Sequence, residues 1–233
     1  MICLWRICFS AFLFAWPLAA GSVIGGVVLK DSRAAAVRKR SDYSGVVVWL
    51  EAPSVKVPGR AKMIQKNKLF LPHILPVQVG TTVDFPNYDP IFHNAFSNFS
   101  GQLFDLGLYP PGTSKSIRFD REGVVRIFCN IHPSMSAVIV VVNSPYFAVT
   151  GEDGAFTIPN VPEGPAVLRV FHERSEATVL RSLERHIAIT AAPLVLPDIT
   201  ISESGYLTVP HKNKYGKDYT TPDESGAYPG VVK

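Results

Sequence analysis

The sequence predicts an all-β fold built from two β-sandwiches in succession. Short runs of apolar and β-branched residues, separated by Gly, Pro, Asn and Asp, recur along most of the chain. The chain has 233 residues and is 47% hydrophobic, so it can bury one large core or two modest ones. Only the stretch 178–185 has even a weak helical pattern. The regular structure is therefore expected to consist of strands.

The first sandwich is expected over residues 22–143. Its strands are predicted at 23–29, 45–50, 77–85, 116–119, 124–129 and 137–142. The loop 130–136 joins the last two of these strands and should lie at one end of the sandwich. Because loops held by a rigid sheet often carry function, this loop is a candidate for chemistry.

The second sandwich is expected over residues 144–202. Asp153 and Gly154 lie between alternating apolar positions, which predicts a β-hairpin. From 203 to 233 the chain is rich in Gly, Lys, Tyr, Thr, Pro and Asp and has no apolar period. That composition predicts a flexible tail, to which we assign no chemistry. Further strands are predicted at 166–172, 186–190 and 194–201.

Residues 1–21 are interpreted as a secretory signal peptide. An apolar run from Ile7 to Ala20 follows Arg6, and small residues follow the run. The run is too short to span a bilayer comfortably, and cleavage is expected after Ala20 or Gly21. An uncleaved N-terminal anchor is the alternative. We expect a periplasmic mature protein without an integral membrane span.

Removing the signal peptide leaves one cysteine, because Cys3 and Cys8 lie within it. Cys129 then has no partner for an internal disulfide. In an oxidising compartment such a thiol is favoured as a metal ligand or a nucleophile. A small buried core residue is the structural alternative.

The charge distribution argues against a nucleic-acid partner. The net charge is +4, and the basic residues gather mainly at 33–40 and 211–217. Neither run alternates with aromatic residues as in a nucleic-acid motif. Arg38, Lys39 and Arg40 are best explained as part of a solvated loop, with an acidic docking partner as the weaker alternative.

Cys129, His132 and Met135 follow one another at three-residue spacing directly after a predicted strand. A thiolate, an imidazole and a thioether so close together can reach one metal ion. Soft sulfur ligands select copper, and two histidines with one Cys and a weak axial Met form the trigonal site of blue-copper proteins. Pro133 stiffens the loop by fixing its own φ.

The second imidazole must come from another part of the chain, and His93 in a Pro- and aromatic-rich turn is the best candidate. Asn94 beside it could hydrogen-bond to the loop that carries the other ligands. His73 is the competing histidine, and we interpret it as a surface or strand-edge residue.

These motifs resemble those of cupredoxins. The Cys-x2-His-x2-Met spacing with Pro133 after the histidine is similar to amicyanin, and the His93-Asn94 pair lies 36 residues before the cysteine, as in cupredoxins. The runs 80–87, 104–107 and 123–125 resemble the plastocyanin-like group labelled methylamine utilization protein. The run 154–162 resembles a motif of the carboxypeptidase-regulatory-like, transthyretin-type sandwich. Unlike amicyanin, the chain has this second sandwich and an insertion at 30–43.

The resemblance implies a Greek-key cupredoxin sandwich over 22–143, followed by the regulatory-like sandwich. It implies one type 1 (blue) copper ion per chain and a carrier of single electrons, not an enzyme. Expected partners are redox proteins: a periplasmic dehydrogenase as donor and a c-type cytochrome as acceptor. Phe92, Ile131 and Pro133 would border the docking surface around His132.

Other readings of the same residues stay open at this point. The chain could bind copper for delivery, although it has only three Met and no Met- or His-rich tract. It could be an envelope scaffold or a carbohydrate-binding module with a vestigial metal site. Zinc accepts the same ligands and could occupy the site in an overexpressing host. A binuclear copper centre is excluded, because it needs two thiolates.

Overall fold

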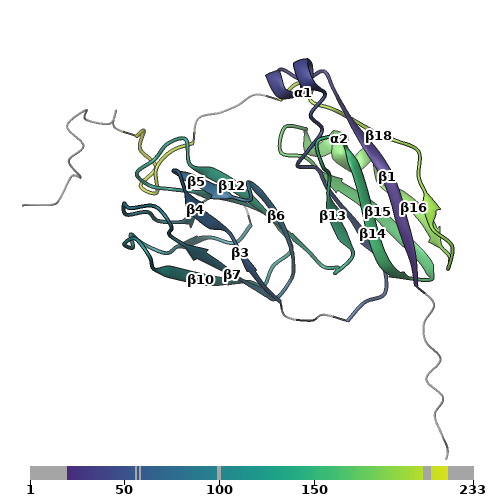
Figure 1. Ribbon diagram of the computed structural model, residues 1–233, viewed down its shortest axis with the longest axis horizontal. Helices are drawn as coiled ribbons and strands as arrows, with labels where there is room; N and C mark the ends of the chain where they lie inside the picture. The colour runs from purple at the N-terminus through teal and green to yellow at the C-terminus, as the bar shows by residue number, and fades with distance from the viewer. Residues whose placement is uncertain (1–19, 56, 58, 99–100, 207–210, 220–233) are drawn as a thin grey trace, which may run out of the picture.

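The computed structural model describes residues 20–55, 57, 59–98, 101–206 and 211–219. Nearly all regular structure within them is β, which confirms the predicted fold class. The strands form two sandwiches that lie side by side (Figure 1). We call residues 60–142 the site sandwich, and residues 20–51 together with 147–202 the flanking sandwich. Residues 1–19, the main part of the predicted signal peptide, lie outside the described residues.

The site sandwich has two main sheets and a small hairpin. The first sheet has the order β10-β7-β3, formed by Ser114–Phe119, Thr81–Pro86 and Arg60–Lys62. The second has the order β6-β12-β11-β8-β9, formed by Ile74–Gln78, Ser136–Val142, Gly123–Phe128, Phe96–Ser97 and Phe104–Asp105. The hairpin pairs β4 (Ile64–Lys66) with β5 (Leu69–Leu71).

The flanking sandwich also has two sheets. In the first, β1 (Ala20–Lys30) pairs antiparallel with β14 (Ala155–Pro162). Strands β17 (Leu194–Val195) and β18 (Ile199–Ser202) are parallel to β1. The second has the order β13-β2-β15-β16, formed by Phe147–Val149, Val47–Glu51, Gly164–Phe171 and Arg185–Ile189. Two short helices complete it, α1 (Ala35–Arg40) and α2 (Ala177–Ser182).

The predicted domain boundaries need correction. Strands β1 and β2 were expected in the first sandwich, but β1 pairs with β14 and β2 pairs with β13 and β15. The purple β1 in Figure 1 accordingly lies among the green strands of the flanking sandwich. An apolar strand pattern indicates burial and not which strand becomes the partner, so the sequence placed these strands with their nearest neighbours. The site sandwich is thus inserted between β2 and β13.

Strand β12 explains how the two sandwiches pack together. Six consecutive residues of β12 are buried, from Ala137 to Val142. Ala137, Ile139 and Val141 belong to the core of the site sandwich. Alternate side chains of the same strand pack against the flanking sandwich in a second cluster with Val47 and Phe171. A strand covered on both faces has a continuous apolar run, which is what the sequence shows here.

Two turns differ from their predictions. The predicted run 77–85 is divided at Gly80, whose φ of +94° favours glycine, so that β6 and β7 enter different sheets. The Asp153-Gly154 turn does not make a hairpin, because β13 and β14 pair with strands of opposite sheets. Gly154 is required there: it has a φ of +78°, and a Cβ atom would lie 2.1 Å from the Val27 carbonyl oxygen.

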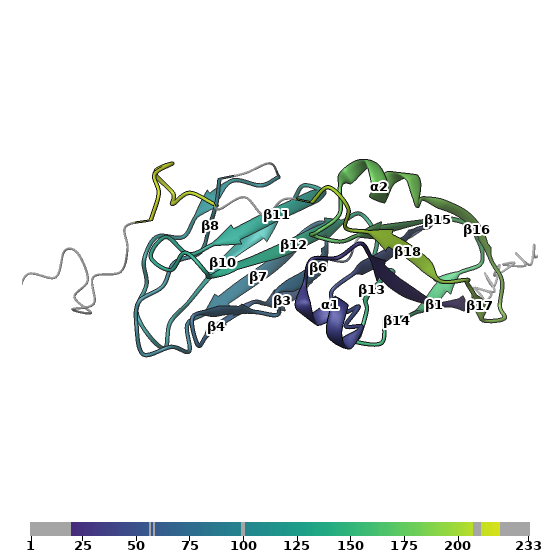
Figure 2. The ribbon, with the colours of Figure 1, turned by 90° about the horizontal axis from the view of Figure 1, so that it is seen from above.

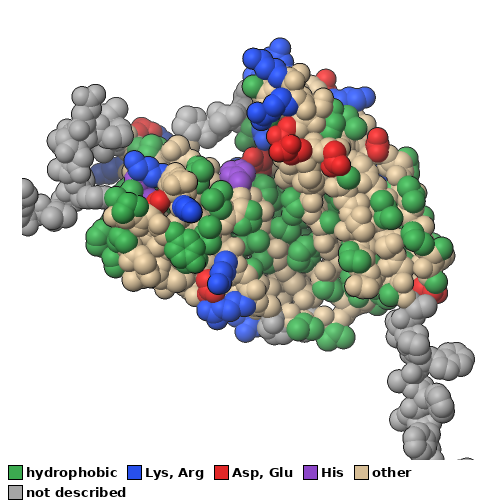
Figure 3. All heavy atoms as spheres, viewed as in Figure 1, with side chains coloured by type: hydrophobic (Ala, Val, Ile, Leu, Met, Phe, Trp, Pro, Cys, Tyr) green, Lys and Arg blue, Asp and Glu red, His purple; other side chains and the backbone are tan. Residues whose placement is uncertain are grey.

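The predicted loop around Arg38 contains α1, which the sequence pattern does not predict. Val37 is its one buried residue and packs into the core of the flanking sandwich, so the apolar signal is weak. Basic side chains surround this helix at the top of the space-filling view (Figure 3). The weak helical pattern at 178–185 corresponds to α2. Within the part of the chain that the structure describes, no helix has the length and apolarity needed to cross a membrane.

Candidate metal centre

The loop 129–135 is closed by its own backbone hydrogen bonds. Strand β11 ends at Phe128, whose antiparallel partner in β12 is Ser136. The Cys129 N–H donates to the Met135 carbonyl oxygen over 3.1 Å. The Met135 N–H donates to the His132 carbonyl oxygen over 3.0 Å. The hairpin therefore fixes the backbone of a compact loop on which three of the predicted ligands are carried.

Three of the predicted ligands converge on one point. The Cys129 Sγ atom is 3.8 Å from the Nδ1 atom of His93 and 3.6 Å from the Nδ1 atom of His132. All three ligand atoms lie within 4.8 Å of one another. Ligands about 2.1 Å from a central ion in trigonal geometry are about 3.6 Å apart, so this triangle is the right size for one metal ion. The donor set of one thiolate and two imidazoles fits copper or zinc.

The site is largely shielded from solvent. Cys129, His93 and Met135 are fully buried, and His132 is partly buried. Met135 packs in the same core cluster as Cys129. Burial, with a contribution from His93, lowers the pKa of His132 to about 4, so its ring is neutral near pH 7. A neutral imidazole has the lone pair that a metal needs.

Burial raises the pKa of the Cys129 thiol, although backbone N–H groups of Asn94, Ile131 and His132 act in the opposite direction. A metal ion binds the thiolate and must therefore displace this proton when it enters the site.

Asp89 fixes the orientation of the His93 ring and was not predicted as a site residue. Its Oδ2 atom lies 2.7 Å from the Nε2 atom of His93, so a proton on Nε2 leaves Nδ1 free for a metal. The carboxylate also accepts the N–H groups of Asn67 and Lys68 over 2.6 and 2.8 Å. Burial acts to raise the pKa of Asp89, but these N–H groups and His93 hold it below its ordinary value.

Asn94 links the two loops that carry the ligands. Its Oδ1 atom accepts the Asn130 N–H over 2.6 Å, and its Nδ2 atom donates to Asp105 over 3.2 Å. His93 is anchored in its own loop by a β-bridge to Tyr109. The predicted contact between Asn94 and the ligand loop is therefore present in the geometry.

The remaining predicted residues lie around the centre or away from it. Phe92 is 45% exposed, Pro133 is exposed and Ile131 is partly buried. His73 does not join the cluster: its Nδ1 atom is 3.1 Å from the Ser136 carbonyl oxygen, and its Nε2 atom faces Glu173 at 2.9 Å. His73 thus lies at the junction of the two sandwiches.

Part of the predicted flexible tail lies against the ligand loop. The described segment 211–219, which we call the clasp, appears in yellow beside β8 in Figure 2 and at the upper left of the site sandwich in Figure 1. The Tyr219 hydroxyl donates to the Cys129 carbonyl oxygen over 2.8 Å. The His211 ring stacks on Phe128, with 4.0 Å between the ring centroids. Instead of standing free as a tail, this segment makes defined contacts with the ligand loop.

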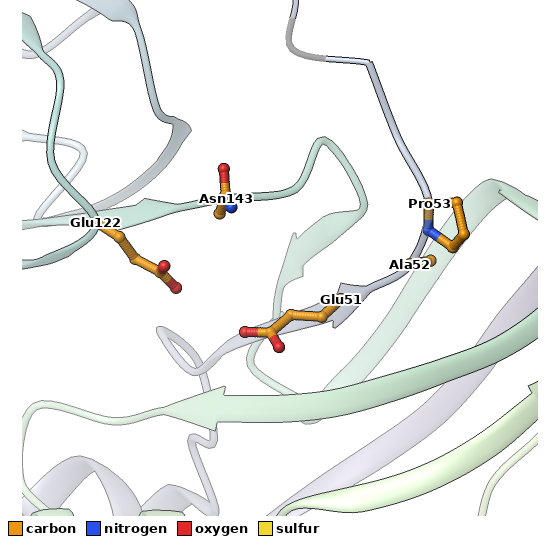
Figure 4. Close-up of a pocket in the computed structure, with 5 residues that line it drawn as sticks. All are labelled: Glu51, Ala52, Pro53, Glu122 and Asn143. Carbon is orange, nitrogen blue, oxygen red and sulfur yellow. The ribbon is translucent and has the colours of Figure 1, made fainter.

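A hollow lies at the ends of β11 and β12 that are farther from the ligand loop. Glu122 precedes β11 and Asn143 follows β12, and Glu51, Ala52 and Pro53 complete the lining (Figure 4). Phe128, which precedes Cys129, and Ser136 mark the opposite ends of those strands. The hollow is therefore not part of the metal centre.

Comparison with known proteins gives matches among solved structures alone. No family model matches the chain, and no curated protein matches it. A purple cupredoxin from Nitrosopumilus maritimus is similar at 29% identity, covering 35% of this chain and 99% of its own, with a TM-score of 0.33. A copper-containing nitrite reductase from Thermus scotoductus SA-01 is similar at 26% identity over 40% of this chain and 24% of its own, with a TM-score of 0.35. Amicyanin from Paracoccus versutus is similar at 20% identity over 35% of this chain and 80% of its own, with a TM-score of 0.34.

Proposed function

We propose that this protein is a mononuclear type 1 copper protein that carries single electrons. The observation that supports the proposal most strongly is the triangle of Cys129 Sγ, His93 Nδ1 and His132 Nδ1, of which Cys129 and His93 are buried and His132 is partly buried. Met135 lies in the same core cluster and would supply the weak axial thioether. This set of imidazole and sulfur ligands accommodates both Cu(I) and Cu(II) with little rearrangement.

A carrier role is favoured over an enzymatic one by the burial of the ligands. Cys129 and His93 are fully buried, while the partly exposed His132 extends toward the surface. Electrons can leave through the His132 ring, whereas a substrate would need direct access to the metal. Copper would supply the redox chemistry, and the protein residues would fix the geometry and exclude water.

The surface around His132 suits brief encounters with other redox proteins. Ile131 and Pro133 flank His132 in the chain and Phe92 precedes His93, so these residues would give this region an apolar border. Weak redox complexes have small interfaces, so a patch of this kind would be sufficient. We propose a periplasmic dehydrogenase as electron donor and a c-type cytochrome as acceptor, reached after export through the signal peptide 1–21.

We also propose a domain family for each sandwich. The site sandwich would be the cupredoxin-type unit, and the flanking sandwich would be the carboxypeptidase-regulatory-like unit. The flanking sandwich supports the site sandwich through the apolar cluster of β12.

The test is to add one equivalent of Cu(II) to the mature chain, residues 22–233, and to record its visible and EPR spectra. We expect an intense thiolate-to-copper band toward the red end of the visible spectrum, and Cys129→Ser should abolish it. Neither the serine variant nor a zinc-loaded sample should show the band. A colourless protein, or tetragonal copper signals unaffected by Cys129→Ser, would discard the carrier proposal in favour of a delivery or scaffold role.

A further inference from the structure

The clasp contacts the ligand loop at three separate residues. The Tyr219 hydroxyl donates to the Cys129 carbonyl oxygen over 2.8 Å. The Lys214 N–H donates to Asn130 Oδ1 over 3.0 Å. A third contact reaches the far side of the same loop.

That third contact joins His211 to Pro133. The His211 Nε2 atom is 2.7 Å from the Pro133 carbonyl oxygen. A carbonyl oxygen can only accept, so Nε2 carries the proton and donates it. The three contacts therefore hold the ligand loop on both sides of His132, at Cys129 and Asn130 before it and at Pro133 after it.

We propose that the clasp is a positioning element for the metal ligands, with Tyr219 and His211 as its main positioning residues. This inference rests on the proposed copper function. Its physical basis is that the Cys129 and Pro133 carbonyl groups belong to the loop that places Sγ and the His132 ring. Hydrogen bonds to both carbonyl groups restrict how far the loop can open.

The clasp also reaches the loop that carries His93. The Lys214 ammonium group lies 2.7 Å from Asp105, and Asp105 accepts a hydrogen bond from Asn94. Asn94 in turn accepts the Asn130 N–H. The chain of contacts therefore returns to the ligand loop and ties both ligand-bearing segments to the clasp.

Ring packing gives the clasp a fixed place on the surface. The His211 ring is stacked on Phe128 at an interplanar angle of 28°, and the Tyr219 ring meets the His211 ring edge-on at 83°. Phe128 immediately precedes Cys129 in the chain, so the clasp packs on the residue next to the thiolate ligand. Ring contacts of this kind orient the Tyr219 hydroxyl toward its acceptor.

A consequence is that the ligand loop is held in its binding geometry before a metal ion arrives. Partners of metal ligands commonly change metal affinity by about 10- to 100-fold when they are removed. Tyr219→Phe removes one hydroxyl group and keeps the ring. We expect it to speed copper release to a chelator by about tenfold.

The experiment uses the full chain with Tyr219→Phe and, separately, His211→Ala. Tyr215→Phe is the matched control. Tyr215 belongs to the same segment and is 70% exposed, and the substitution keeps the ring that lies against Lys214. Two quantities are measured: copper release from loaded protein, and hydrogen exchange of the 129–135 amides in metal-free protein. Exchange in the two test variants should be about five- to tenfold faster than in the wild type.

The outcomes separate this inference from the copper proposal. Faster exchange and release in Tyr219→Phe and His211→Ala, with Tyr215→Phe unchanged, would support the clasp. Equal behaviour of all variants and the wild type, or an equal change in the control, would overturn it. If the wild type shows no thiolate-to-copper band, the copper proposal fails, and the exchange data alone then decide whether the clasp holds the loop.

Discussion

At the scale of single residues, the His93–Asp89 pair shows how a buried carboxylate selects one imidazole nitrogen. Asp89 faces Nε2 at 2.7 Å, and Nδ1 faces the Cys129 sulfur atom. The backbone N–H groups of Asn67 and Lys68 keep Asp89 ionised and in place. The pair thus sets both the tautomer and the direction of the ligand ring.

We predict that Asp89→Asn weakens copper binding by about 10- to 100-fold. Asn removes the negative charge that holds the proton on Nε2 of His93. Its amide N–H group would also face a backbone N–H or the His93 ring, where an acceptor is needed. A competition titration with a copper chelator measures the change. Asp120→Asn is the control, because Asp120 is exposed and pairs with the exposed Arg118. Equal affinities in both variants would mean that Asp89 does not orient His93.

Residue spacing predicted the ligand candidates but not the groups that hold them. Cys129, His132 and Met135 are close in sequence, so a shared loop brings them together whatever the details of the fold. Asp89 lies four residues before His93, a spacing that carries no meaning until the turn between them is known. The Tyr219 contact joins residues 90 positions apart, and only the fold reveals it.

At the scale of elements, the junction of the two sandwiches combines an apolar layer with one ion pair. Val138 and Val140 of β12 pack against Phe171 at the end of β15. At the edge of this layer, His73 faces Glu173 at 2.9 Å, and Arg174 lies 3.6 Å from the same carboxylate group. The hydrogen bond to Glu173 raises the pKa of His73. Burial acts to raise the pKa of Glu173, but His73 and Arg174 hold it below its ordinary value.

The stabilisation from this pair should depend on pH. The raised pKa of His73 contributes stability that is fully present below its ordinary value of 6.5 and is lost as the pH rises through the raised value. The lowered pKa of Glu173 contributes stability that is present above its ordinary value of 4.5 and is lost on acidification. The pair should therefore stabilise the junction most between these two values.

We predict that His73→Gln lowers the free energy of unfolding by up to about 1 kcal/mol near pH 6, because the pair is partly exposed. The loss should shrink at a pH well above 6.5, once the pH has passed the raised pKa of His73 and its ring in the wild type has given up its proton. Urea unfolding at the two pH values measures the difference. His186→Gln is the control, since His186 is 84% exposed and 4.0 Å from its acidic neighbour. A loss that does not change with pH would contradict the ion-pair explanation.

Strand patterns predicted elements better than partners. The runs 23–29 and 45–50 are strands as expected, yet they pair with β14 and β15 across the inserted sandwich. Their apolar residues could pack in the core of either sandwich, so periodicity alone does not predict which core they join. Helix α1 was missed for a related reason, because Val37 is its single buried residue.

At the scale of the whole molecule, one sandwich is inserted in the other. The ends of the insertion lie next to each other, because Trp49 of β2 is the antiparallel partner of Phe147 in β13. A segment whose two ends are adjacent can be inserted in a surface turn without changing the host fold. The apolar layer at β12 then couples the site sandwich to its host.

This architecture predicts which fragments of the chain fold. A flanking sandwich made by joining residues 20–51 to 147–202 through a short turn should fold cooperatively, because all of its strands are present. The contiguous fragment 144–202 should not, because it lacks β1 and β2, the central strands of both sheets. Without them, Ile158 and Leu168, which are fully buried, would lose much of the core that covers them.

Far-UV circular dichroism and thermal unfolding distinguish the two fragments. A sigmoidal transition for the joined fragment and none for 144–202 is the expected result. Cooperative unfolding of 144–202 would show that the chain divides near residue 143, as its sequence pattern alone suggests. The comparison is decisive because both fragments contain β13 to β18, and the joined fragment adds β1, α1, β2 and the joining turn in place of residues 144–146.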